Sequence, residues 1–258
     1  MAKVLAISSQ VVFGPVGNSA AVPALLEQGH DVMQLPTILL SHHPGHGPPA
    51  VQHIEIAALI ASVEERGGFA DCAAVMTGYF ASAEQVIEAA ALVARLKSAN
   101  HELLVLVDPV LGDDGALYVA PPVAEAIRDQ LVPLASIITP NCFELSWLAG
   151  LVVSDESSAK SAVRQLKMTE ALVTSLPVSA STIGTLLVAN GVNHCITSER
   201  KANVPHGAGD FLAGAYLAHR LKEMPDAAFR HAMARLQQAI VASGDGKQLV
   251  TSRPSGSR

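Results

Sequence analysis

The feature that most constrains this chain is the alternation of short, uninterrupted apolar runs with longer segments of helical periodicity. The apolar runs are Val4–Ser8, Ala73–Thr77, Leu103–Val107 and Ser136–Thr139. Helix-patterned segments follow three of these runs, at residues 18–28, 83–97 and 143–149. Strands that are apolar on both sides are buried on both faces, as in a parallel sheet covered by helices. The pattern therefore predicts an α/β fold with a mostly parallel, doubly wound central sheet and helices on both faces.

The last third of the chain has a different pattern of apolar and polar residues. After the run at 172–175, two apolar segments, Ile183–Asn190 and Val192–Thr197, are joined by Gly191, which is typical of an antiparallel hairpin. Residues 209–221 and 226–242 then have helical patterning. No repeat or linker interrupts the chain, so we expect one domain over residues 1–243 and a frayed polar tail over 244–258.

Composition excludes several classes of function. Half of the 258 residues are hydrophobic and 16% are charged, so a large core is available and global disorder is excluded. The net charge of −6 gives no basic footprint for nucleic acid, and no apolar run reaches membrane length. The three cysteines form no C-x-x-C pair. We expect a soluble, cytoplasmic protein with neither nucleic acid nor membrane as a partner.

Polar residues follow each apolar run, which is where ligands bind in open α/β sheets. In chain order they are Ser8 to Gln10, Thr77 to Tyr79, Asp108, Thr139 to Asn141, and Thr174 with Ser175. The motif HGAGD, residues 206–210, precedes the next helical segment. Several strands are thus predicted to deliver polar groups to one rim.

Two interpretations compete at HGAGD. The backbone N–H groups of Gly207, Ala208 and Gly209 could hold a phosphate at a helix N-terminus, with the Asp210 carboxylate ready to accept a proton from an alcohol. Such an arrangement suits phosphoryl transfer, which needs mainly alignment and charge stabilisation. The alternative is a glycine turn in which Asp210 only starts a helix.

Asp108 and the segment Thr139 to Glu144 form a second constellation. Carboxylates next to a polyphosphate are tolerated when a divalent cation lies between them, which predicts metal placement by Asp108 and Glu144. Asn141 and Glu144 also have the spacing of a capping box. The two roles are compatible, because a cap leaves one carboxylate oxygen free.

Two loops have weaker signals. Residues 9–18 contain glycines but neither a G-x-G-x-x-G nor a G-x-x-x-x-G-K-[ST] motif, so they indicate either a turn capped by Asn18 or a ligand contact. Residues 41–49 contain His42, His43 and His46. Their spacing is poor for a metal site, and a flexible surface loop that acts as a lid over a small aromatic substrate is the expectation.

Taken together, these segments resemble the pyridoxal kinases of the ribokinase superfamily. The motifs follow in the family's order over most of residues 4–221, and they read SSQVVFGPVGNSAA, LPTILLSHHPGHG, TGYFASAEQ, DPVLGDDG, ITPNCFEL and HGAGD. The resemblance implies a ribokinase-like three-layer fold and ATP-dependent phosphorylation of the 5′-hydroxymethyl group of pyridoxal, pyridoxine or pyridoxamine. It also implies a homodimer and the cofactor Mg²⁺, with K⁺ or Na⁺ as a further candidate.

The resemblance also implies a role for each site residue. Asp210 would be the base, and Gly207, Ala208 and Gly209 would form the anion hole. Ser9, His46 and Tyr79 would contact the vitamer. Nucleotide and metal would be organised by Asp108 and Glu144, helped by Asp113, Thr139, Thr174 and Ser175.

The chain departs from the family pattern at one motif position, and alternatives stay open. Many relatives have threonine where this chain has Ala208, so a hydroxyl that could serve ATP or a monovalent ion is missing. One alternative is a hydroxymethylpyrimidine or sugar kinase of the same superfamily. Another is a vitamer-binding protein without turnover.

Overall fold

The computed structural model describes residues 1–189, 191–201, 203–244 and 246–252, and the chain forms two compact units. The first unit comprises residues 1–78 with the C-terminal part from residue 202, and the second comprises residues 79–201. The functional motifs are divided between the two units.

A four-stranded section of sheet organises the first unit, with the strand order β3-β2-β1-β4. The strands are β1 (Lys3–Phe13), β2 (Asp31–His42), β3 (Val51–His53) and β4 (Cys72–Thr77). β1 is parallel to both β2 and β4, whereas β3 is antiparallel to β2. Val4 to Ile7 of β1 are all buried, as the uninterrupted apolar run predicted.

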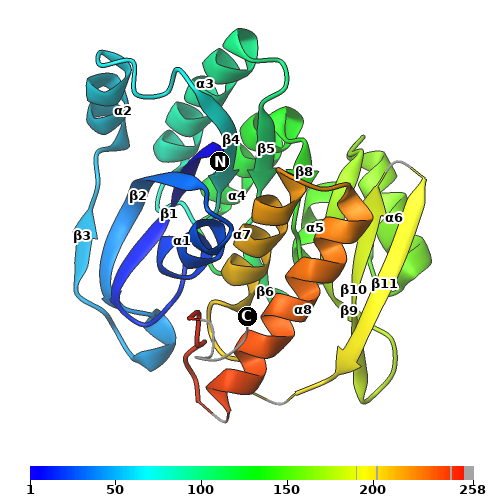
Figure 1. Ribbon diagram of the computed structural model, residues 1–258. Helices are drawn as coiled ribbons and strands as arrows, with labels where there is room; N and C mark the ends of the chain where they lie inside the picture. The colour runs from blue at the N-terminus through cyan, green and yellow to red at the C-terminus, as the bar shows by residue number, and fades with distance from the viewer. Residues whose placement is uncertain (190, 202, 245, 253–258) are drawn as a thin grey trace. The chain divides into compact units, whose positions relative to one another are not determined.

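Helices cover this section of sheet. They are α1 (Asn18–Glu27), α2 (Ile56–Glu64), α7 (Ala208–Arg220) and α8 (Pro225–Ser243), with a 3₁₀ turn at Pro44–His46. α7 packs between α1 and α8 (Figure 1). The backbones of α1 and α7 approach closely at Gly214, where a Cβ would lie 2.5 Å from the carbonyl oxygen of Ala21. Phe211, Tyr216 and Phe229 fill the core beside these helices.

The second unit has a five-stranded section of sheet with the order β11-β10-β9-β8-β5. Its strands are β5 (Leu104–Val107), β8 (Ile137–Ile138), β9 (Glu170–Pro177), β10 (Thr182–Ala189) and β11 (Val192–Glu199), and a separate hairpin is formed by β6 (Gly112–Asp113) and β7 (Ala116–Leu117). β5, β8 and β9 are parallel, while β10 and β11 are antiparallel. The hairpin predicted at residues 183–197 is confirmed; Asn190 lies outside the described residues.

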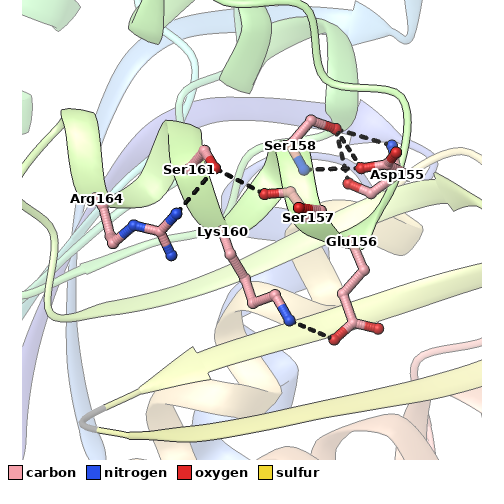
Figure 2. Close-up of polar contacts among 7 residues, drawn as sticks. All are labelled: Asp155, Glu156, Ser157, Ser158, Lys160, Ser161 and Arg164. Atoms are coloured by element: carbon pink, nitrogen blue, oxygen red, sulfur yellow. Dashed lines mark hydrogen bonds and ion pairs between the residues drawn. The ribbon is translucent and has the colours of Figure 1, made fainter.

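The helical segments of this unit are α3 (Ala83–Ala99), α4 (Pro121–Ala126), a π turn (Ile127–Leu131), a 3₁₀ turn (Val132–Leu134), α5 (Cys142–Ala149) and α6 (Glu156–Gln165). Figure 2 shows how local sequence starts α6. Asp155 accepts the backbone N–H of Ser158 at 2.7 Å, and Ser158 accepts that of Asp155 at 3.0 Å. One turn on, Lys160 pairs with Glu156 at 2.9 Å. These short polar side chains satisfy N–H groups that a helix start leaves without partners.

The predicted α/β class with mostly parallel strands and helices on both faces is confirmed. A single domain over residues 1–243 stays a prediction. In the segment 244–258, residues 245 and 253–258 lie outside the described residues, while Leu249 is buried and the His206 N–H donates to Lys247. Among the described residues, no helix combines the length and hydropathy that crossing a bilayer requires.

Candidate functional site

The residues predicted to form the site fall into two groups, one in each unit. The first unit contains Ser9, His46, Gly207, Ala208, Gly209 and Asp210. The second contains Tyr79, Asp108, Asp113, Thr139, Glu144, Thr174 and Ser175. The first group has a carboxyl at a helix N-terminus, and the second has two buried carboxyls, Asp108 directly after a strand and Glu144 in the first turn of a helix.

α7 begins at a glycine whose conformation other residues rarely adopt. Gly207 is the N-cap with φ of +88°, and a Cβ there would lie 1.8 Å from the carbonyl oxygen of Pro15. The N–H groups of Ala208 and Gly209 belong to the first turn, where no carbonyl of the same helix is available to them. Together with the positive end of the helix dipole, they form a site suited to an anion.

Asp210 lies in the same first turn. Burial raises the pKa of its carboxyl to about 6, although hydrogen bonds from the N–H of Gly17 and from its own N–H favour the charged form. The residue keeps part of its surface accessible. A carboxyl with a pKa close to neutrality and an accessible edge is suited to general-base chemistry.

Gly17, in the loop between β1 and α1, lies against Ser9 of β1 and donates to this carboxyl. Ser9 is buried, and its Oγ lies 2.3 Å from where a Cβ on Gly17 would be. Gly17, with φ of +55°, is the N-cap of α1. The expected capping by Asn18 is wrong, because its amide instead donates to the carbonyl of Ser8 at 3.3 Å. This places Ser9, Gly17 and Asp210 at one point of the first unit.

Three imidazoles gather near the same helix start. The rings of His43 and His206 are stacked with centroids 4.3 Å apart, and His46 lies edge-on to His206 at 5.6 Å. Burial, followed by the neighbouring imidazoles, lowers the pKa of His43, and burial and His46 lower that of His206. His46 itself is exposed. The histidine loop is thus anchored to the residue that directly precedes Gly207.

In the second unit, two strand ends are joined by a buried hydrogen bond. Asp108 follows β5 and Thr139 follows β8, and Thr139 Oγ1 donates to the Asp108 carboxylate at 2.7 Å. Both side chains are buried. The parallel pairing of β5 with β8 explains why two residues 31 positions apart meet.

Glu144 lies in the first turn of α5, and backbone N–H groups donate to both of its carboxyl oxygens. Asn141 and Glu144 form the predicted capping box, with Glu144 Oε2 accepting the N–H of Asn141 at 2.8 Å. The other oxygen accepts the N–H of Leu111 at 3.0 Å. Burial, and then the charge of Asp108, raises the pKa of Glu144 to about 8.

The buried carboxyls of Asp108 and Glu144 suit a hard divalent cation. Burial is the main cause of the raised pKa of Glu144 and the charge of Asp108 adds to it, so a cation between the two carboxyls would favour their ionised forms. Carboxylate oxygens are the protein ligands that Mg²⁺ prefers, usually with several waters retained. The donor set therefore fits the predicted metal.

The remaining residues of the second unit lie around the start of α5. Thr174 pairs with Asn141 in an isolated parallel bridge, and its N–H donates to Pro140 at 2.9 Å. Ser175 follows it, exposed and with φ of +58°. Asp113 lies in the β6–β7 hairpin.

Tyr79 begins the second unit directly after β4. Burial raises the pKa of its hydroxyl. Its role as a vitamer contact remains a prediction.

Sequence reasoning missed three participants. The sequence places His43 in the predicted lid loop but does not indicate that its ring stacks on His206, and it assigns no role to His206. Gly17 lies in the loop predicted to be either a turn or a ligand contact, and its hydrogen bond to Asp210 is not indicated by the sequence. The available signal was adjacency: His206 precedes the glycine motif, and Gly17 precedes the first residue of α1.

Comparison with known proteins gives consistent matches. The chain matches the family model described as phosphomethylpyrimidine kinase over residues 19–251. It is 37% identical over 234 residues to pyridoxal kinase PdxY of Granulibacter bethesdensis, which covers 84% of this chain and 81% of that protein.

Solved structures agree with these sequence matches. Pyridoxal kinase from Entamoeba histolytica superposes with a TM-score of 0.91 at 29% identity, covering 97% of this chain and 93% of that one. The Leishmania donovani enzyme in complex with ADP and pyridoxamine gives a TM-score of 0.90, with the same identity and coverage. The expected three-layer α/β fold is thereby confirmed.

Proposed function

The chain belongs to the phosphomethylpyrimidine kinase family and, within it, to the pyridoxal kinases, and from this premise we propose that it transfers the γ-phosphoryl group of ATP to the 5′-hydroxymethyl group of pyridoxal, pyridoxine or pyridoxamine. The observation that carries the proposal is the Asp210 carboxyl, with a pKa of about 6, in the first turn of α7 beside the N–H groups of Ala208 and Gly209. The Leishmania donovani structure with ADP and pyridoxamine supports the choice of nucleotide and vitamer.

In the proposed reaction, Asp210 accepts the proton of the vitamer hydroxyl as its oxygen bonds to the γ-phosphorus. The bond from that phosphorus to the bridging oxygen breaks, and ADP leaves. The N–H groups of Gly207, Ala208 and Gly209 stabilise the charge on the transferring oxygens. Ser9, His46 and Tyr79 contact the vitamer.

Nucleotide binding is assigned to the second group of residues. Asp108 and Glu144 hold Mg²⁺, which offsets the charge of the phosphates, and Thr139 orients Asp108 through the 2.7 Å hydrogen bond. Asp113, Thr174 and Ser175 contact the nucleotide. K⁺ or Na⁺ is a further candidate cofactor, although Ala208 provides no hydroxyl for it; ATP turnover with each salt tests this.

The experiment that tests the function is ADP release with each vitamer, with and without Mg²⁺. Hydroxymethylpyrimidine and ribose serve as competing acceptors. Magnesium-dependent ADP release with a B6 vitamer, at a higher kcat/KM than with the other alcohols, supports the proposal. Preference for hydroxymethylpyrimidine would assign the other kinase activity, and vitamer binding without ADP release would make this a binding protein.

We also propose that the protein is a cytoplasmic homodimer. Its three cysteines are unpaired, as in proteins of reducing compartments. Val12 and Phe13 at the end of β1 are 77% and 60% exposed, and Val51 on the edge strand β3 is 47% exposed. Apolar side chains of this kind fit a self-association surface.

The oligomeric state is tested by light scattering during size-exclusion chromatography. Phe13→Asp is expected to give a monomer, because it puts a charge into the proposed interface. Val152→Asp is the control, since Val152 is 83% exposed in the second unit. Identical masses for both variants and the parent would argue against this surface.

A further inference from the structure

A second cluster of ionisable side chains lies at the opposite end of α7 from Asp210. His219 Nδ1 is 3.3 Å from Glu223 Oε1, and His231 Nδ1 is 2.8 Å from Glu223 Oε2. The two imidazole rings lie 5.0 Å apart between centroids. Each oxygen of the Glu223 carboxylate thus lies within hydrogen-bond distance of one imidazole nitrogen.

The turn between two helices creates this cluster. α7 ends at Arg220 and α8 begins at Pro225, so Glu223 lies in the connecting bend while His219 and His231 project from the two helices. Arg220 donates to the carbonyl oxygen of Glu223 at 3.1 Å, which fixes the backbone of the bend. The two imidazoles are therefore held by packed helices, and the carboxylate by a short bend whose backbone Arg220 fixes.

The distances between the ligand atoms of these three side chains are close to those found around a coordinated metal ion. One ligand atom from each residue lies within 4.8 Å of the other two. Two ligands about 2.1 Å from a tetrahedral ion lie about 3.4 Å apart, close to the 3.3 Å between His219 and Glu223. The side chains are 14%, 28% and 58% exposed for His219, Glu223 and His231, so the cluster has an open side through which an ion and a water ligand can enter.

We propose that His219, Glu223 and His231 form a binding site for a divalent transition metal ion of the zinc type, with water as the fourth ligand. Two imidazoles with one carboxylate are a set that Zn²⁺ and Co²⁺ accept readily, whereas Mg²⁺ favours oxygen ligands alone. On binding through Nδ1, a neutral imidazole carries its proton on Nε2, so coordination requires no other reactant.

Two positively charged side chains near the cluster, Lys222 and Arg220, lower the expected affinity for the metal ion, but both donate to backbone carbonyls rather than to the three proposed ligand side chains. Lys222 donates to the carbonyl oxygen of Gln28, and Arg220 is engaged by the backbone of Glu223. Their positive charge opposes that of the ion, so binding is expected to be weaker than at a closed four-ligand zinc site. The competing explanation of the cluster is a latch, in which the hydrogen bonds from His219 and His231 to Glu223 join α7 to α8 and no ion binds.

The site is separate from the proposed chemistry. His219 is nine positions after Asp210 in the same helix, which corresponds to a rise of roughly 14 Å. An ion there would stabilise the α7–α8 turn without contacting the transferring phosphoryl group. We therefore expect zinc to raise thermal stability while kcat with saturating Mg²⁺ and ATP stays within about twofold.

The test is zinc binding by calorimetry and thermal unfolding of the chelator-treated full chain. The parent should bind Zn²⁺ and unfold at a higher temperature with Zn²⁺ than with an equal concentration of Mg²⁺. His231→Ala should bind one Zn²⁺ fewer and lose this shift. Glu223→Gln should weaken binding at least tenfold, which provides a second variant that keeps both imidazoles.

His43→Ala is the matched control, because it removes an imidazole from the other histidine cluster. It should keep the zinc stoichiometry of the α7–α8 site. Co²⁺ should show the intense absorption of four-coordinate cobalt in the parent and in His43→Ala alone. Equal zinc stoichiometry in the parent and His231→Ala, or no zinc binding by the parent, would overturn the proposal and leave the latch.

Discussion

The backbone N–H of Gly17 donates a hydrogen bond to the carboxyl of Asp210. The loop before α1 and the first turn of α7 therefore meet at the proposed general base. This hydrogen bond favours the ionised carboxyl, while burial opposes it and sets the pKa to about 6.

The first prediction concerns turnover. Asp210→Asn should lower kcat by about 10²-fold or more, because the amide cannot accept the hydroxyl proton. KM for pyridoxal should change little. In the parent, kcat/KM should rise with pH through about 6 as the carboxyl ionises. Steady-state kinetics from pH 5 to 8 measures both. A variant with near-normal kcat would remove Asp210 from the mechanism.

The second prediction concerns stability at the same residue. The pKa rises from 3.8 in the unfolded chain to about 6, so the folded protein binds the proton more tightly. Stability therefore falls as the pH rises between about 4 and 6, and the penalty persists above that range. Asp210→Asn removes the penalty and should be more stable at pH 7.5 by about 2–3 kcal/mol.

Urea unfolding at pH 7.5 and pH 4 checks the second prediction. The gain should shrink toward zero at pH 4, where the parent carboxyl is protonated in the folded state. An equal gain at both pH values would mean that side-chain packing, rather than charge burial, is responsible.

The periodicity of the sequence was sufficient for the elements that are uniformly apolar or strongly capped. β1, β4 and β5 were predicted from buried runs, and α5 from the Asn141 and Glu144 capping box. α2 and α6 were not predicted. α6 starts with short polar residues and has a mean composition that resembles a loop, and only the Asp155–Ser158 spacing indicates its start.

The sequence was sufficient to predict which residues belong to the proposed site, but not which of them contact one another. Asp210 and Glu144 stand out because their motifs are local. The donation from Thr139 to Asp108 depends on strand pairing across 31 positions, which no local pattern contains. The contact between His43 and His206 depends on how the β2–β3 arm lies over the start of α7.

The third prediction separates two glycines of the same motif. Gly209→Ala should fold, because a Cβ there has no neighbour within 4 Å among the described residues. Alanine in the first turn should add about 0.5–1 kcal/mol of stability. However, the added methyl group occupies space assigned to the phosphates, so KM for ATP should rise severalfold or more.

Gly207→Ala is the contrasting variant. Its Cβ would lie 1.8 Å from the Pro15 carbonyl oxygen, and φ is +88°. Folding should fail or lose several kcal/mol. Thermal unfolding and ATP titration of both variants test the pair. An unchanged KM for ATP in Gly209→Ala would argue against the anion hole.

The fourth prediction concerns a largely buried ion pair that joins α8 to α1. Arg235 of α8 donates to both carboxylate oxygens of Glu27 at 2.8 and 2.9 Å, and its guanidinium lies 4.9 Å from the ring centre of Phe211, the residue after Asp210. Arg235→Met should cost about 3–5 kcal/mol, because it removes the guanidinium that donates to both carboxylate oxygens of Glu27. Arg230→Ala is the control, because it breaks the exposed pair with Asp226 on the same helix, and it should cost about 1 kcal/mol or less.

A double variant separates the charge from the packing. Combining Arg235→Met with Glu27→Gln should recover much of the loss, since the Glu27 charge is then gone. Urea unfolding of these three variants and the parent tests this prediction. A double variant as unstable as Arg235→Met would show that the packing of Arg235 on Phe211 of α7, rather than its ion pair with Glu27 of α1, accounts for the loss.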